Sequence, residues 1–443
     1  MRLRLGLQKY MTLSDKKVFG VSSPGFLLIL ATLVKILVIY FFYQKVVGYD
    51  GNVATIQTGY GWSGLVESMQ RGEYELNSQS GLSDLYDLNA KALRTPLYAL
   101  FLYALTFLGP FASWIAVIVQ SIVTSLVAWF GYKIIRRFTT NDRLPLIGVA
   151  GLFIFPMNFL KSGTIDDAPM MLMFSLISAY YLILYFQQGQ RHLRFLIWGA
   201  AFMGFAILTR TILMPVFMAL CLYMLIFTRK RWLNTAVFIT MFYLVLSPWI
   251  IRNYAIYDQI VIIDGTNRFF VITQSDEFIE RFPETSIDDI ERSYLREYHE
   301  THPYLSDLDA LELNREFGRL AVEEFKEDPW NMVEATFVKL KVFLPYKIFP
   351  ERENNTIKSI VYVIPYLISL LLFLYALVWK RHFNHQLNIM LVFVVCYAAV
   401  GVVFLLLSRH FYPLIVYMAL YGLMVLGADE TRKKSLTAVN QAI

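Results

Sequence analysis

Long apolar runs alternate with short charged stretches along most of the chain, and this pattern predicts a helical membrane protein. The runs are roughly 16–22 residues long, close to the length with which a helix crosses a bilayer. A shorter apolar stretch, Leu97–Leu108, predicts a helix that lies along the interface. The predicted spans, about ten in number, are residues 24–43, 111–132, 144–160, 168–186, 195–209, 212–227, 233–250, 357–378, 387–407 and 411–426.

Basic residues follow every second span, as the positive-inside rule expects of cytoplasmic ends. This alternation predicts that both termini are cytoplasmic. The basic N-terminal stretch leads directly into a full-length span, which indicates an uncleaved anchor rather than a signal peptide. The predicted localisation is a multi-pass protein of a bacterial or archaeal inner (plasma) membrane, with its active site facing outside.

The charge pattern divides the chain into three parts. We predict an N-terminal transmembrane catalytic core, residues 1–251, with a first outer loop at 44–110. An acid-rich extracytoplasmic segment follows at 252–356, and residues 357–443 form the C-terminal transmembrane helices and a cytoplasmic tail. The predicted fold class is therefore an all-α polytopic membrane protein with interfacial helices in the first outer loop and a small soluble outer segment.

Local patterns predict the elements of the outer segment. Ile260–Ile263 and Phe269–Thr273 flank Asp264-Gly265, a dipeptide that suits the tight turn of a β-hairpin. Apolar residues recur at helical spacing over about 307–325, which predicts an amphipathic helix, and a second helix is expected over about 330–343.

Composition excludes other classes of protein. Of the 443 residues, 57% are hydrophobic and only 17% are charged, which an ordinary soluble domain does not show. The formal charge is +6, but the basic residues cluster at the ends of apolar spans. They therefore indicate membrane topology rather than nucleic-acid binding. Cys221 and Cys396 both lie in apolar runs, so neither a disulfide framework nor a thiolate metal site is expected.

Charged residues on the predicted outer face are the candidates for chemistry. Singly, such residues are more often solvated caps or headgroup anchors. Together they suit a phosphate-bearing lipid, because an arginine fork matches phosphate oxygens and keeps its charge. A nearby carboxylate would take the proton of an incoming hydroxyl, and fixed cations would stabilise the phosphate leaving group by roughly a few kcal/mol. The candidates are Asp50, Arg94, Asp166, Asp167, Arg210, Arg252 and Arg409.

Several stretches carry a family resemblance. The chain resembles the glycosyltransferases of the GT-C class that use polyprenyl-phosphate sugars, in the branch of protein O-mannosyltransferases and lipid A aminoarabinose transferases. The most specific stretch is Pro248-Trp249-Ile250-Ile251-Arg252-Asn253-Tyr254 at the end of an outward span. The others are Tyr49-Asp50, Arg94-Thr95-Pro96-Leu97-Tyr98, Asp167-Ala168-Pro169, Glu323–Pro345 and Ser408-Arg409-His410-Phe411-Tyr412-Pro413.

The resemblance implies roles for the candidates. Asp50 would be the general base, and Asp167, beside Asp166, the second outer acidic residue. Arg94 and Arg252 would be lipid-phosphate or structural partners. We place Arg210, Arg409 and Tyr98 with them as substrate-binding candidates. The family often has an acidic residue directly after the first aspartate, where this chain has Gly51.

With the resemblance, these observations predict a membrane glycosyltransferase, and the resemblance implies inversion at the anomeric carbon. It would move a sugar from a polyprenyl-monophosphate carrier to a hydroxyl of a lipid, glycan or protein at the outer face. No cofactor is assigned and no metal-binding residue is named, although two carboxylates would also suit a divalent cation. Besides the donor, the expected partners are that acceptor and membrane lipids; no nucleic acid is expected.

Two rival functions stay open. A transporter or flippase for polyprenyl-linked glycans should carry polar or broken helices at mid-membrane, whereas the spans here read as nearly charge-free at their centres. A glycan polymerase or ligase would need a large Arg-rich outer loop, and this outer segment is acid-rich. A weaker candidate is a metal site at His299 and His302, which lie beside Glu297 and Glu300.

Overall fold

The structure is a computed structural model in which the placement of most of the chain is described. Asp50, Gly51 and Arg409, singled out above, lie outside the described residues. Those residues are 17–18, 21–47, 62–77, 89–92, 94–141, 143–163, 165–265, 267–282, 284–285, 287–343, 356–380, 384–404 and 411–442.

Nearly all of the described chain is helical, as predicted, and its β-structure is two short antiparallel ladders. Lys17–Val18 (β1) pairs with Val21–Ser22 (β2), and Leu76–Asn77 (β3) with Asn89–Ala90 (β4). The transmembrane and interfacial helices are α1 (Ser23–Val47), α2 (Trp62–Gln70), α3 (Pro96–Thr106), α4 (Ala112–Ile135), α5 (Arg143–Ile154), α6 (Pro156–Gly163), α7 (Ala168–Gln187), α8 (Leu193–Thr209), α9 (Met214–Phe227), α10 (Arg231–Tyr257), α16 (Thr356–Tyr375), α17 (His385–Phe404) and α18 (Phe411–Ala442).

Each predicted span coincides with helix wherever the structure describes it. Among the described residues, 6 helices are long and apolar enough to cross a membrane, or 7 if the bent pair α5–α6 is one span. Shorter apolar helices occupy the positions predicted for spans at 195–209, 212–227 and 357–378. The prediction of an all-α integral membrane protein is confirmed.

One predicted span, 144–160, is wrong as a continuous helix. Its axis bends by 60° between α5 and α6, where Pro156 begins α6. Proline has no N–H, so the carbonyl of Leu152 lacks the donor that residue 156 would otherwise supply. The side-chain amide of Asn158 donates to that carbonyl instead, at 2.7 Å. The helix can therefore break here without leaving a buried acceptor unpaired.

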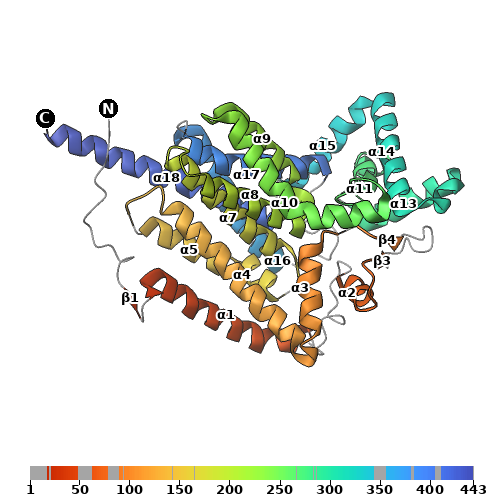
Figure 1. Cartoon of the computed structure of the whole chain (residues 1–443), viewed down its shortest axis with the longest axis horizontal. Helices are drawn as coiled ribbons and strands as arrows, with labels where there is room; N and C mark the ends of the chain where they lie inside the picture. The colour runs from red at the N-terminus through yellow and green to blue at the C-terminus, as the bar shows by residue number, and fades with distance from the viewer. Residues whose placement is uncertain are drawn as a thin grey trace.

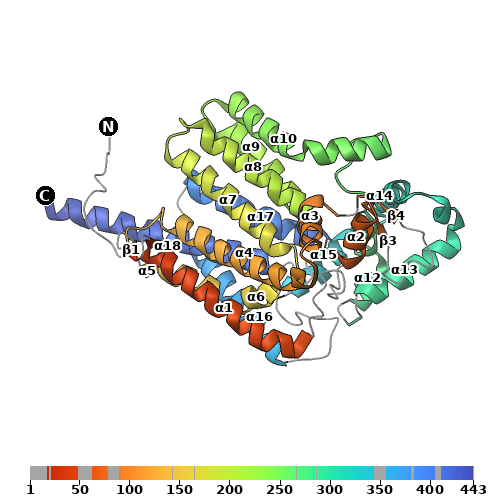
Figure 2. The same cartoon turned by 60° about the horizontal axis from the view of Figure 1, so that its bottom comes forward.

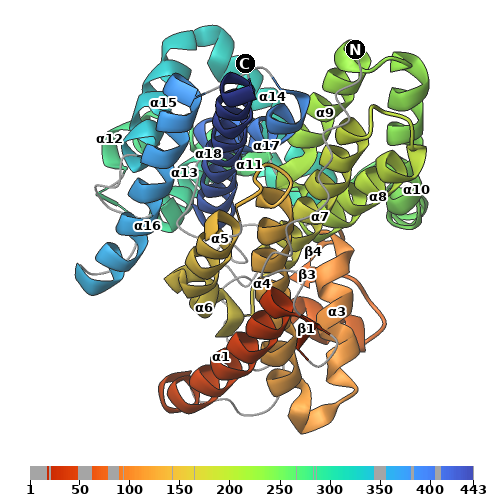
Figure 3. The same ribbon diagram turned by 90° about the vertical axis from the view of Figure 1, so that its left-hand side faces the viewer.

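The helices of the bundle differ in how much of their surface is buried. Helix α7 lies at its centre, packed against α4, α8 and α17, and 83% of its apolar window is buried. At the edge, α1 has 17% of its window buried and runs beside α4 and α6 (Figures 2 and 3). Its exposed leucines and valines form a surface suited to lipid. Helix α3 lies at a steep angle to α4 (Figure 1) and packs on α2, α4 and α8.

The outer segment forms the opposite end of the molecule from the C-terminal end of α18 (Figure 1). It begins after α10, and its regular secondary structure among the described residues is helical. Its helices are α11 (Asn267–Ile272), α12 (Asp276–Arg281), α13 (Ile287–Thr301), α14 (Ala310–Glu327) and α15 (Pro329–Phe343).

The predicted β-hairpin in this segment is wrong. The stretch after Asp264-Gly265 forms α11, because its apolar residues pack against α14 rather than along a partner strand. The two helices meet at Gly318, where an added Cβ would lie 2.6 Å from Asn267 Nδ2. The predicted amphipathic helix is confirmed as α14, which starts with a capping box between Asp309 and Glu312. The helix predicted over about 330–343 is confirmed as α15.

Candidate active site

The candidates that the structure describes fall into two groups. The first group lies where α6, α7 and α8 meet, and we call its charged residues, Lys161, Asp166, Asp167 and Arg210, the acid–base turn. The second group ties α10 to the first outer loop, and we call it the guanidinium–aromatic joint: Arg94 and Arg252 with Trp62, Tyr74 and Trp249. The roles predicted for Asp50 and Arg409 stay predictions.

The acid–base turn holds two ion pairs. Asp166 pairs with Lys161, and the second carboxylate oxygen of Asp166 accepts from the Ala168 backbone N–H at 2.8 Å. Asp167 pairs with Arg210 at 3.2 Å between Oδ1 and Nη1. Both aspartates are buried, with residue exposures of 2% and 6%. The turn therefore places two carboxylates and two cations inside the bundle, side by side.

Local structure explains why these side chains meet. Asp167 is the N-cap of α7, where negative charge is favoured by the helix dipole. Arg210 is a single extended residue between α8 and a short 3₁₀ turn (Thr211–Leu213), so its side chain leaves the helix at the level of the turn. Desolvation alone would raise the pKa of Asp166, but the charges of Lys161 and Arg210 outweigh it and lower that pKa. Asp166 is accordingly ionised at neutral pH.

Tyr98 connects the first outer loop to this turn. Its hydroxyl donates to Gln120 Oε1 at 2.5 Å, and Gln120 Nε2 donates to the backbone carbonyl of Lys161 at 3.0 Å. Tyr98 is fully buried and packs edge-on against Trp62. Sequence reasoning missed Lys161 and Gln120, although a lysine five residues before Asp166 in an apolar stretch was a readable signal.

The guanidinium–aromatic joint is built differently. Arg252 donates to the carbonyls of Lys91, at 2.6 Å, and Tyr74, at 3.2 Å. Its guanidinium lies 5.1 Å from the ring centre of Tyr74 and 4.9 Å from that of Trp249. Arg94 lies over Trp62 at 4.5 Å, and its backbone carbonyl accepts from Tyr74. These contacts fasten α10 to the loop on either side of the β3–β4 ladder.

The other polar residues of the most specific motif make the same kind of contact. Trp249 Nε1 donates to the carbonyl of Ile262, and Asn253 Nδ2 donates to that of Val261, both at 2.8 Å. Asp264, just beyond, accepts from the backbone N–H of Ala92 at 2.7 Å and from Tyr257 at 2.5 Å. The motif thus anchors the C-terminal end of α10 to the first outer loop and to the stretch that follows α10.

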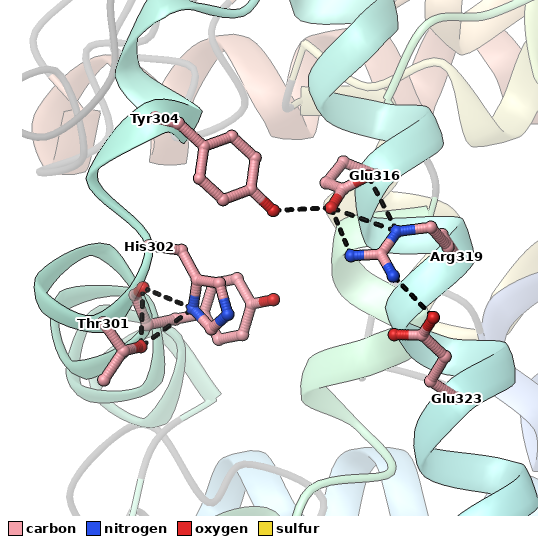
Figure 4. A network of polar contacts seen from close by, with 7 residues as sticks. Thr301, His302, Tyr304, Glu316, Arg319 and Glu323 are labelled. Atoms are coloured by element: carbon pink, nitrogen blue, oxygen red, sulfur yellow. Dashed lines mark hydrogen bonds and ion pairs between the residues drawn. The ribbon is translucent and has the colours of Figure 1, made fainter.

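No metal site emerges among the described residues, which contain no group of three or more His, Cys, Asp and Glu side chains placed to hold an ion. Asp166 and Asp167 are each already paired with a cation, so this donor set does not fit a divalent metal. The weak candidate His302 stacks on Tyr298, with ring centres 4.2 Å apart, beside the Glu316–Arg319 pair on α14 (Figure 4). We assign no step to a metal.

The sequence analysis expected the spans to be nearly charge-free at their centres, and this expectation is wrong for α1. Lys35 lies midway along α1 and is fully buried, with Nζ 2.6 Å from Thr124 Oγ1 on α4. Together with the break between α5 and α6, it removes one of the arguments used above against a transporter.

Comparison with known proteins finds one family profile and solved structures that resemble this chain. Residues 93–251 match the family profile of dolichyl-phosphate-mannose-protein mannosyltransferases, a little over a third of the chain. No curated protein matches the chain. Among solved structures, ArnT from Cupriavidus metallidurans bound to undecaprenyl phosphate is similar at 13% identity, with a TM-score of 0.39, over 92% of this chain and 78% of that one. The same protein in its apo state is also similar at 13% identity, with a TM-score of 0.39, over 91% of this chain and 77% of that one.

The matched segment contains the acid–base turn, Tyr98 and Arg94, and it ends one residue before Arg252. The profile match confirms the resemblance to polyprenyl-phosphate-sugar-dependent glycosyltransferases of the GT-C class and, with it, the prediction that this membrane protein is a glycosyltransferase.

Proposed function

We propose that the protein transfers one sugar from a polyprenyl-monophosphate carrier to a hydroxyl acceptor at the outer face of the membrane, with inversion at the anomeric carbon. The acid–base turn supports this proposal most strongly. It concentrates ionised carboxylates and fixed cations at the end of apolar helices. Charge in such a place is costly and is retained where chemistry requires it. The turn also lies wholly within the segment that matches the mannosyltransferase profile.

Each part of the reaction has a residue type suited to it. Inverting transfer needs one carboxylate to take the acceptor's proton as the hydroxyl attacks the anomeric carbon from the face opposite the phosphate. We assign that role to Asp50, as the resemblance implies. Arg210 and Arg94, with Arg409, would offset the charge that grows on the departing phosphate. In this scheme Asp167 orients Arg210 through their 3.2 Å ion pair.

The test is turnover by the purified full-length protein in proteoliposomes, with a panel of polyprenyl-phosphate sugars and simple acceptors. Wild type should consume one monophosphate donor and release the free carrier phosphate. Asp50→Asn should abolish release, whereas Arg191→Ala, an exposed change on the predicted inner side, should leave it unchanged. A chelator should have little effect, since no step is assigned to a metal.

The same preparation separates the main rival. If no donor is consumed but labelled glycolipid moves across the bilayer, the protein is a transporter and the transferase proposal fails. If a diphosphate donor is used in preference, the protein belongs with the polymerases or ligases instead. Retained turnover in Asp50→Asn would leave the transferase in place and remove Asp50 as its base.

A further inference from the structure

Lys35 is a buried cation in the middle of a membrane span, and nothing in the scheme above uses it. Helix α1 touches the bundle along one narrow stripe, which includes Thr32, Lys35 and Ile39. Most of its other side chains that the structure describes are exposed or partly exposed and apolar. Among the residues that the structure describes, no carboxylate forms an ion pair with Lys35. A lysine at this depth is costly unless its donors are satisfied.

The ammonium is satisfied by neutral groups of other helices. Lys35 Nζ lies 2.6 Å from Thr124 Oγ1 and 3.4 Å from Asn158 Oδ1. The rings of Phe153 and Phe159, on either side of the α5–α6 break, lie 5.2 and 5.5 Å from the same nitrogen. Lys35 therefore contacts both arms of the bent pair α5–α6.

The contact with Asn158 decides which way its side-chain amide faces. An ammonium offers donors and no acceptor, so the oxygen of the amide must face Lys35. Tyr412 donates to that oxygen as well, at 3.5 Å. The NH₂ group is then directed to the carbonyl of Leu152, the one that Pro156 leaves without a donor. Lys35 thus fixes the amide orientation that stabilises the bend.

The bend in turn sets the position of the acid–base turn. Helix α6 has barely two turns and carries Lys161 and Ser162 on its last one. Ser162 Oγ lies 2.7 Å from Thr124 Oγ1, the partner of Lys35, and the carbonyl of Lys161 accepts from Gln120. A change in the direction of α6 would therefore move Lys161 away from Asp166.

Another proline, Pro248, offers a comparison with the bend at Pro156. Pro248 lies inside α10, and the carbonyl of Leu244 loses its usual donor there in the same way. Ser247 donates to Leu244 from within the helix, at 2.8 Å, and α10 continues as one helix. At Pro156 the donor comes from Asn158, beyond the break, and its orientation depends on another helix.

From these contacts we propose that Lys35 is a positioning residue of the transferase site, acting through Asn158 and the α5–α6 bend on Lys161 and Asp166. This inference rests on the proposed function. Lys35 touches no substrate in this scheme. A lysine that was merely tolerated should be replaceable by an apolar side chain of similar size without loss of activity.

The test compares three variants of the full-length protein in one detergent: Lys35→Met, Asn158→Asp and, as a control, Lys133→Met. Lys133, at the cytoplasmic end predicted for α4, also lies against aromatic rings, 5.4 Å from Trp129 and 5.2 Å from Phe130. Asn158→Asp gives Lys35 an ion pair but removes the donor to Leu152. It therefore distinguishes two roles of Asn158: providing a polar partner for Lys35, and donating to the Leu152 carbonyl at the bend.

Two measurements are made on each variant. Backbone hydrogen exchange over residues 150–163 measures the local stability of the bend without any substrate. Initial rates against donor concentration give kcat and KM and so report on the site. Lys35→Met and Asn158→Asp should speed exchange and lower kcat about tenfold or more with donor KM little changed. Their unfolding temperatures should not fall below that of wild type by more than the control's does.

Each result has a separate meaning. Unchanged exchange would overturn the control of the bend by Lys35. Faster exchange with unchanged kcat would overturn its role in the site. Full activity of Asn158→Asp would show that Lys35 needs only a partner. A wild type that turns over no donor would instead refute the transferase proposal and the positioning role with it, while exchange would still report on the bend.

Discussion

The acid–base turn and the guanidinium–aromatic joint both hold partly buried arginine, yet they satisfy its donors in opposite ways. In the turn, Arg210 meets the carboxylate of Asp167. In the joint, Arg252 meets two backbone carbonyls and two aromatic rings. The first arrangement keeps two opposite charges that a substrate can rearrange. The second consumes the donors of the guanidinium in holding segments together.

This difference separates residues that look equivalent in the sequence. Arg94, Arg210 and Arg252 each lie at the predicted outer end of an apolar run, and each suits a phosphate equally well. Their partners divide them. Arg210 has its partner on a different helix at the candidate site, whereas Arg252 belongs to a motif whose other members, Trp249 and Asn253, also bind carbonyls. We therefore expect changes in the two regions to have different signatures.

The largest effect should follow Asp167→Asn. The neutral amide leaves the Arg210 charge without its counter-ion in a buried site, so the arginine is free to move away from the donor phosphate. We expect turnover to fall by about 100-fold or more, with the unfolding temperature little changed. Steady-state rates with the preferred donor measure this, and Asp289→Asn on the exposed face of α13 is the control.

A large fall in the unfolding temperature of Asp167→Asn would contradict the distinction between the two regions. The acid–base turn would then be a structural joint as well. The double variant Asp167→Asn/Arg210→Gln sharpens the result. If the two residues act as one unit, the double variant should be no slower than the more damaged single variant.

A smaller effect, of a different kind, should follow Arg252→Ala. The change leaves the carbonyls of Lys91 and Tyr74 without their donor and removes a cation from between two rings. We expect the free energy of unfolding to fall by about 2 kcal/mol, read as a lower unfolding temperature in detergent. Arg191→Ala, at an exposed side chain on the predicted inner side, should leave that temperature unchanged.

Donor KM then tests the binding role that the sequence also allowed for Arg252. A rise in donor KM in Arg252→Ala with unchanged stability would indicate that Arg252 binds the donor phosphate. A fall in stability with normal KM in the surviving folded protein would establish the joint.

The apolar runs predicted most of the fold, because one bilayer-length helix leaves little freedom in its own secondary structure. The helices α4, α7 and α10 lie where the pattern placed them. The outer segment was harder. Asp264-Gly265 suited a hairpin on local grounds, but the carboxylate of Asp264 is used by Ala92, far back in the chain. Local propensity holds no information about such a partner.

The candidate site was predicted in its residue types and only partly in its members. Asp166, Asp167 and Arg210 come together as the outer-face argument required. Lys161, directly after the predicted span 144–160, was not singled out, although its position five residues before Asp166 was visible. Lys35 was visible as well, in the middle of the first run, but the break at Pro156 that gives it a partner depends on tertiary packing.

A third cation, Lys339 on α15, resembles Arg252 in having a carbonyl partner, and its effect should appear as a dependence of stability on pH. Its Nζ donates at 2.8 Å to Val403, whose carbonyl lies in the last turn of α17 and also accepts from Gln274. Burial lowers the pKa of Lys339 to about 7. In the unfolded chain a lysine has a pKa of about 10.4. Between these values the unfolded chain binds a proton that the folded protein lacks, so stability should rise with pH from about 7 toward 10 and stay level below 7.

The measurement is the unfolding temperature of wild type and Lys339→Met at several pH values across that window, with Lys326→Met, at an exposed site of α14, as the control. Wild type should gain on Lys339→Met as pH rises, whereas the control should run parallel to wild type. Parallel curves for all three proteins would mean that Lys339 stays charged when folded. The rise in stability with pH that burial predicts for Lys339 would then be refuted.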